Sequence, residues 1–201
     1  TFLQKQEGKA LKNIAFTCEG QIQKGEAVIT RFGIEGNAIY GLSPKIQNQL
    51  DQFGQAKVML DLKPPFSEEV IYDRLKKSKA KNTTLALRKD LNLDALKVAL
   101  IKHVVSKEVF QDLKQLAQNI KALPLTLLDA APLDEAISTT GGIALSTVDQ
   151  HLQLKALPNH YCIGEMLDWN APTGGYLLQA CFSMGVYLAK HLNQVRRTLD
   201  V

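Results

Sequence analysis

The stretch YCIGEMLDWNAPTGGYLLQACFSMG (residues 161–185) joins a short apolar run to a glycine-rich turn and an apolar helix. Residues 160–164 are expected to form a buried strand that ends at Gly164. The carboxylate of Glu165 then stands at the end of that strand, which is where α/β sheets bind their ligands. A lone Gly-Glu pair is more often a strand end followed by a solvated acid, so this pair needs a second feature beside it.

The second feature is PTGGY (172–176), which opens an apolar helix running to about residue 192. Thr173 can cap this helix, and Gly174 and Gly175 leave the amides of its first turn uncovered. A helix start of this kind presents N–H groups and the positive end of the helix dipole to an anion or a carbonyl oxygen. The helix also carries small residues at four-residue spacing that favour close packing on a sheet, namely Cys181, Gly185 and Ala189. Together the two features predict one half of a binding site.

Residues 1–66 are expected to be β-rich. Short runs of β-branched and aromatic residues predict strands at 13–17, 26–30 and 57–62. Glycines between these runs mark turns. Residues 35–53 are more helix-like, with Pro44 limiting the continuity of the helix.

Residues 67–123 are expected to form a helical unit of three or four helices that ends before Pro124. Ser67 is a candidate N-cap because two glutamates follow it. Apolar residues recur at the helical period in two sets, which are Leu93, Leu96, Leu100 and Val104, then Val109, Leu113, Leu116 and Ile120.

Residues 124–201 change character again, with strands expected at 125–129 and 139–145 as well as at 160–164. A strand followed by glycine and then a helix is typical of an α/β nucleotide-binding lobe. The predicted fold class is therefore α+β, in which a β-rich part and a helical part precede the strands and helix of such a lobe.

The composition excludes several classes of protein. The 201 residues are 45% hydrophobic and 22% charged, so the chain can bury a core. Its formal net charge of +4 is too small for a nucleic-acid-binding footprint. Three cysteines without a C-x-x-C pair favour a reducing compartment, and the sequence shows neither a signal peptide nor an apolar run long enough to span a bilayer. We expect a cytoplasmic protein with no nucleic-acid partner and no membrane partner.

A basic run and the scattered histidines are weaker candidates for a site. The run consists of Arg74, Lys76, Lys77, Lys79 and Lys81. Helix C-termini favour cations and no aromatic platform accompanies the run, so a solvated helix end explains it better than a phosphate or nucleic-acid contact. The four histidines show no ligand spacing, and no metal site is expected.

Residues 161–185 strongly resemble the C-terminal FAD-binding motif of a family of bacterial NAD(P)/FAD-dependent oxidoreductases, which includes aminoacetone oxidases and bile-acid dehydro-reductases. TTGGIALSTVD (139–149) is similar to the family's Thr-x-Gly-Gly-Val segment. GEAVITRFGIEGNAIYGLS (25–43) is similar to the segment that opens the family's inserted domain. The three blocks follow the family's order, but IEGN (34–37) departs from the Ser-Gly-Pro type sequence usual there, so the resemblance does not transfer a substrate.

The resemblance implies a two-lobed dinucleotide-binding fold of the glutathione-reductase kind, interrupted by an insert. Residues 1–123 would be the insert, barrel-like over 1–66 and helical over 67–123, and residues 124–201 would return to the FAD-binding domain. In such flavoproteins the acid matching Glu165 bonds the ribityl chain of FAD. The residues that would lie at the cofactor are Gly141, Gly142, Gly164, Glu165, Thr173, Gly174 and Gly175.

One part of the family's pattern is missing. The Gly-x-Gly-x-x-Gly that cradles the FAD pyrophosphate does not occur, because no two glycines in the chain are separated by a single residue. The sequence also begins at Thr1 rather than Met, and together these features predict the C-terminal part of a longer flavoprotein. We expect the chain alone to hold FAD weakly or not at all, and its partner to be the missing N-terminal FAD-binding segment.

Two functions of different classes remain at this point. The first is a flavin-dependent oxidoreductase, with FAD, a small-molecule substrate and possible use of NAD(P)H, in which the insert covers the flavin. The second is a non-catalytic binding or scaffold module without flavin. The sequence names no catalytic acid or base, no substrate and no oligomeric state.

Overall fold

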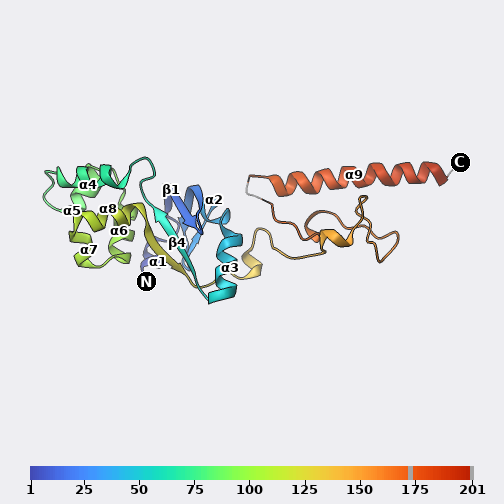
Figure 1. Cartoon of the computed structure of the whole chain (residues 1–201), viewed down its shortest axis with the longest axis horizontal. Helices are drawn as coiled ribbons and strands as arrows, with labels where there is room; N and C mark the ends of the chain where they lie inside the picture. Colours follow the sequence, from blue (N-terminus) through green and yellow to red (C-terminus); the bar gives the residue numbers. More distant parts are fainter. Residues whose placement is uncertain (172–173, 200–201) are drawn as a thin grey trace. The chain divides into compact units, whose positions relative to one another are not determined.

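The computed structural model describes residues 1–171 and 174–199, and it divides into two compact units (Figure 1). The first unit is Thr1–Ala130 and the second is Ala131–Val201. Each unit is described by itself.

The first unit is built on a curled antiparallel sheet of five strands, in the order β3-β2-β1-β4-β5. The strands are β1 Ala10–Cys18, β2 Gln21–Ile29, β3 Ile34–Glu35, β4 Ala56–Asp61 and β5 Leu123–Leu127. Glu19 and Gly20, both with positive φ, form the two-residue turn that joins β1 to β2. The strands predicted at 13–17, 26–30 and 57–62 are confirmed.

Helices cover the sheet. α1 spans Phe2–Gln6, and the helix-like region between β3 and β4 is divided into α2 Asn37–Tyr40 and α3 Ser43–Phe53. Pro44 lies in the first turn of α3, where its missing N–H costs no hydrogen bond. Side chains alternate in and out along β4, so Ala56, Val58 and Leu60 are buried in the core between sheet and helices.

The helical part lies between β4 and β5 and contains five α-helices, more than the three or four expected. These are α4 Glu68–Lys76, α5 Thr83–Lys89, α6 Ala95–Val104, α7 Lys107–Gln111 and α8 Leu113–Lys121. A side-chain oxygen caps each N-terminus, and the caps are Ser67, Asn82, Asp94, Ser106 and Asp112. The predicted cap at Ser67 is therefore confirmed. Leu96, Leu100, Leu116 and Ile120 are buried in one core with the sheet residues.

A buried lysine joins the helical part to the sheet. Lys97 on α6 is only 6% exposed. Its ammonium donates to the carbonyl oxygen of Leu62 at 2.9 Å and to that of Asn13, in a bulge of β1, at 3.4 Å. Burial lowers the pKa of Lys97 below its ordinary value of 10.5, because burial penalises the charged form.

β5 closes the first unit. The strand expected at 125–129 is observed as Leu123–Leu127, paired antiparallel with β4. This strand therefore returns the chain to the sheet of the first unit after the helical excursion.

The second unit consists of irregular chain with short 3-10 turns, followed by a long helix. The turns are η1 Leu133–Glu135, η2 Leu145–Thr147 and η3 Gly164–Met166, and the helix is α9 Tyr176–Leu199. The strands predicted at 139–145 and 160–164 are wrong, because the structure shows only isolated bridges, Ile143 to Leu167 and Gln153 to Tyr161. A strand needs a neighbouring strand for its backbone groups, and the described part of this unit supplies none.

The helix predicted from about residue 174 is confirmed, and it continues past residue 192. None of the helices in the described part of the chain combines the length and apolarity that crossing a bilayer requires.

Candidate functional site

The double glycine of the second unit lies against the 3-10 turn that carries Glu165. The backbone N–H of Ile143 donates to the carbonyl oxygen of Met166 at 2.8 Å, and the N–H of Asp168 donates to the carbonyl oxygen of Ile143 at 2.8 Å. Gly142 has a φ of +144°, and a Cβ there would lie 2.7 Å from the Met166 oxygen. Only glycine fits this close approach, so the backbone contact explains Gly142. A Cβ at Gly141 would meet no atom within 4 Å, so the backbone at Gly141 is open.

Gly164 attaches the 3-10 turn η3 to α9. Its φ is +67°, and its N–H donates to the Met184 sulfur at 3.4 Å. A Cβ at this position would be 3.4 Å from the Cys181 sulfur. Cys162 is buried beside Val148 and Leu167 in the small core of this unit. Cys162 and Cys181 are both free thiols.

Glu165 has an exposed carboxylate. It accepts no hydrogen bond and forms no ion pair with any residue that the structure describes, and the same holds for Asp168. An ionised carboxylate of this kind is a free acceptor for hydroxyl groups of a ligand.

The start of α9 is a glycine turn. Gly174 and Gly175 are exposed, with φ of +105° and +85°, and the carbonyl oxygen of Gly175 accepts from Gln179 N–H at 3.0 Å to open the helix. A Cβ at Gly175 would meet nothing within 4 Å. Thr173, the predicted cap, lies outside the described residues.

The predicted residues therefore fall into two groups. Gly141–Gly142 and Gly164–Glu165 are brought together by the Ile143–Leu167 bridge, although they are far apart in the sequence. Gly164 touches α9 at Cys181, which is about 8 Å along the helix axis from Tyr176. No hydrogen bond between described residues links Glu165 to Gly174 or Gly175.

The sequence interpretation missed the outer face of α9. Leu178, Phe182 and Val186 recur every four residues and are 63%, 68% and 56% exposed. Because residues four apart share one helix face, these side chains form an apolar stripe. Their four-residue spacing is visible in the sequence. The sequence analysis instead predicted packing from the small residues of the same helix.

Two histidines hold α9 to the preceding loop. The rings of His151 and His191 stack with centroids 3.8 Å apart, and the hydroxyl of Tyr187 donates to the Gln150 carbonyl oxygen at 3.0 Å.

The pKa of Asp149 is lowered, first because its carboxylate accepts from the backbone N–H of Gln153. Over the described residues, no three His, Cys, Asp or Glu side chains lie together in a way that could hold a metal ion.

Residues 1–138 match the family described as "HI0933-like protein barrel and H2TH domain". The chain belongs to this HI0933-like family. The description agrees with the first unit, in which a curled antiparallel sheet is combined with a helical part inserted between β4 and β5. The HI0933-like family is associated with FAD-binding flavoproteins. The glycines and the acid of the second unit lie beyond the matched residues, so their roles rest on their own geometry.

Proposed function

We propose that this chain forms part of an FAD-dependent oxidoreductase and that its second unit binds one side of the flavin cofactor. The observation that carries the proposal is the Ile143–Leu167 bridge, which brings the turn at Gly141–Gly142 against Gly164–Glu165. Membership of a flavoprotein-associated family supports the same function.

The residues present fit such a cofactor. A Cβ built at Gly141 or Gly175 would meet none of the described atoms within 4 Å, so space is open beside both glycines. Glu165 supplies a free carboxylate to accept hydrogen bonds from ribityl hydroxyl groups. The start of α9 supplies the N–H groups of a helix N-terminus and a positive dipole end, which stabilise negative charge.

FAD would supply the hydride chemistry, and the protein would supply binding and orientation. Glu165 would fix the ribityl chain, and Thr173, Gly174 and Gly175 would face the pyrimidine edge or the pyrophosphate. The enzyme would act on a small-molecule substrate, with NAD(P)H as electron donor. We assign no side chain as general acid or base.

The rest of the cofactor site would come from a segment outside these 201 residues that carries Gly-x-Gly-x-x-Gly. The apolar stripe of Leu178, Phe182 and Val186 supports this arrangement, because a helix of an α/β lobe buries such a face against the sheet. With this segment absent, the chain lacks the pyrophosphate cradle and is expected to hold FAD weakly or not at all.

The test uses the complete encoded protein and the 201-residue chain side by side. The complete protein is expected to show flavin absorption bands, and the chain alone is not. In the complete protein, Glu165→Gln should weaken FAD binding about tenfold, since a hydrogen bond to a charged group contributes roughly 1.5–3 kcal/mol. Glu135→Gln, at an exposed acid of the same unit, is the matched control.

The outcomes separate the two functions. Visible flavin bands with selective loss in Glu165→Gln support the enzyme. A complete protein without flavin would contradict the proposal and favour a non-catalytic binding module. Equal occupancy in both variants would remove the ribityl contact from Glu165.

A further inference from the structure

Positive charge is concentrated at the corner formed by α4, α5 and the loop between them. Residues 73–90, here called the basic corner, contain seven Lys and Arg but only two Asp and Glu, a net charge of +5. The whole chain carries +4, so this short segment accounts for all of the excess. Because like charges repel, such a cluster destabilises the folded unit unless a counter-ion covers it.

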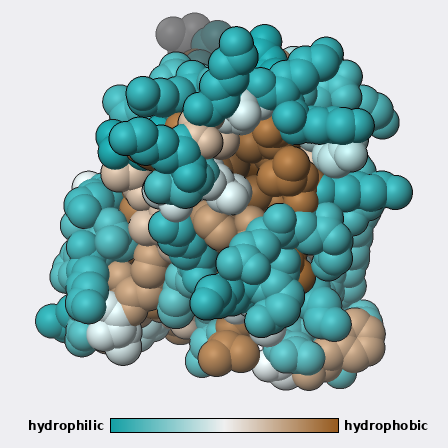
Figure 2. All heavy atoms as spheres, turned by 90° about the vertical axis from the view of Figure 1, so that its left-hand side faces the viewer, coloured by the Kyte–Doolittle hydropathy of each residue, from teal (hydrophilic) through white to brown (hydrophobic). Residues whose placement is uncertain are grey.

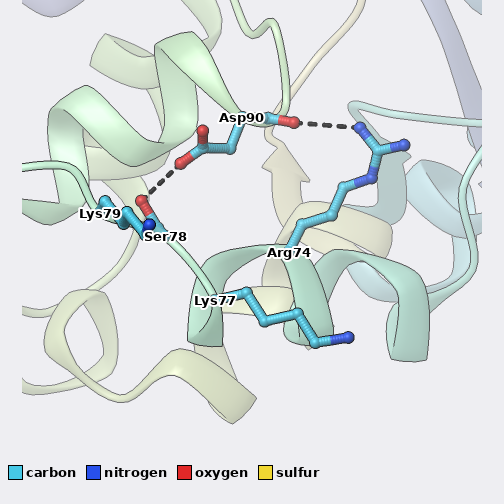
Figure 3. Close-up of a pocket in the computed structure, with 5 residues that line it drawn as sticks. All are labelled: Arg74, Lys77, Ser78, Lys79 and Asp90. Atoms are coloured by element: carbon cyan, nitrogen blue, oxygen red, sulfur yellow. Dashed lines mark hydrogen bonds between the residues drawn. The ribbon is translucent and has the colours of Figure 1, made fainter.

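Arg74 is held in place at this corner. Its guanidinium stacks 4.3 Å from the ring centroid of Phe66, and its Nη1 donates to the carbonyl oxygen of Asp90 at 3.2 Å (Figure 3). Two contacts fix the side chain while its remaining N–H groups have no partner among the described residues. Arg74 is therefore already ordered, so ligand binding does not have to include the entropy cost of fixing its side chain.

The loop after α4 is also fixed. The Ser78 hydroxyl donates to the carboxylate of Asp90 (Figure 3). It also accepts from the backbone N–H of Ala80 at 3.1 Å. These hydrogen bonds fix the backbone of the loop that carries Lys77 and Lys79. Neither lysine forms an ion pair with any described residue.

An open cavity of about 440 Å³ is lined by Arg74, Lys77, Ser78, Lys79 and Asp90. The volume is in the range of small-molecule sites, and the lining suits an anion rather than an apolar ligand. We propose that the basic corner binds the phosphate groups of a small phosphorylated ligand through Arg74, Lys77 and Lys79. A planar guanidinium and two ammonium groups match the several oxygens of a phosphate.

A solvated helix end does not explain the whole corner. Helix dipoles account for Arg74 and Lys76 in the last turn of α4, but Lys79 and Lys81 lie in the loop beyond that turn. A membrane surface fits poorly, since no large apolar side chain between residues 73 and 90 is exposed, and hydrophilic side chains cover most of the face in Figure 2. Single-stranded nucleic acid usually needs open aromatic faces, whereas cations lie over the rings of Phe66 and Tyr72.

The test measures binding of inorganic tripolyphosphate to the full 201-residue chain by calorimetry and by the rise in melting temperature. Saturable binding of one ligand per chain is expected. The double change Lys77→Gln/Lys79→Gln should weaken it about tenfold or more, because two charge-assisted contacts are lost. Lys24→Gln/Lys107→Gln removes the same charge from exposed positions of the first unit and should leave the affinity nearly unchanged.

A second variant predicts the opposite change. Asp90→Asn keeps an oxygen to accept from the Ser78 hydroxyl but removes the negative charge from the cavity, so tripolyphosphate should bind more tightly. Equal weakening by both lysine pairs would show a response to net charge alone and would overturn the site. Binding of an oligonucleotide that tripolyphosphate does not displace would overturn the assignment to a small ligand.

Discussion

The two units of this chain differ in how their apolar residues are covered. In the first unit 28 buried residues form one core that sheet and helices share, whereas the described core of the second unit contains three, Val148, Cys162 and Leu167. The second unit also leaves several large side chains of α9 exposed, among them Leu178, Phe182 and Val186. The first unit therefore carries its own stabilising core, whereas the second unit has a small core and exposed apolar side chains on α9.

The largest expected effect comes from opening the core of the first unit. Phe16 on β1 is fully buried, so Phe16→Ala should lower the free energy of unfolding by about 3–5 kcal/mol through lost burial and a cavity. Urea unfolding of the full chain, followed by circular dichroism, measures the change. Leu167→Ala in the second unit serves as the comparison and should leave this main transition in place. If both changes shift it equally, the two units unfold as one and the comparison fails.

A smaller effect is expected where the second unit depends on one backbone contact. Gly142→Ala would place a Cβ 2.7 Å from the Met166 oxygen at a φ of +144°, so it should break the Ile143–Leu167 bridge at a cost of about 1–3 kcal/mol. Hydrogen exchange at the amides of Ile143 and Asp168 should accelerate in this variant. Gly141→Ala shares the positive φ but meets open space, and should affect these amides less. Unchanged protection in Gly142→Ala would contradict the close approach.

The same difference between units governs what sequence reasoning could predict. In the first unit, runs of β-branched residues and the cap at Ser67 agree with the tertiary structure, so β1, β2, β4 and the start of α4 were predictable. In the second unit, residues 139–145 and 160–164 have strand-like composition but no strand beside them. Strand propensity expresses packing against neighbours, so it fails where the neighbours are missing.

The candidate site was predictable for a different reason. Neighbouring atoms come close to the backbone at Gly142 and Gly164, where a side chain would be crowded. A glycine at such a position can be recognised in the sequence before the contact itself is known. The bond of Ile143 to Met166 and the position of η3 on α9 were not predictable, because they depend on how distant segments meet. The fixed Arg74 of the basic corner was hidden in the same way, since its contacts with Phe66 and Asp90 join separate elements.

The buried lysine of the first unit predicts a dependence of stability on pH. Lys97 loses its proton in the folded chain at a lower pH than in the unfolded chain, where its pKa is near 10.5. Between those two values the folded state binds fewer protons than the unfolded state, so the free energy of unfolding should rise with pH in that window. Lys97→Met should remove this rise, whereas Lys102→Met, on the exposed side of the same helix, should retain it. Urea unfolding at a series of alkaline pH values measures both, and a rise that persists in Lys97→Met would assign it to another group.

The smallest effect on stability, and the sharpest test of the uncovered surface, is expected on α9. Leu178 and Phe182 are 63% and 68% exposed. Because little of their apolar area is buried, Leu178→Gln/Phe182→Gln should change the free energy of unfolding by less than about 0.5 kcal/mol. The expected gain is in solution behaviour, because exposed apolar stripes promote association. Sedimentation velocity should show less concentration-dependent association in the double variant than in the parent chain. Gln179→Ala/Ser183→Ala changes the neighbouring polar pair of the same helix and should leave the association unchanged. A large loss of stability in the glutamine variant would mean that the stripe is already covered within this chain, which would remove the difference between the two units.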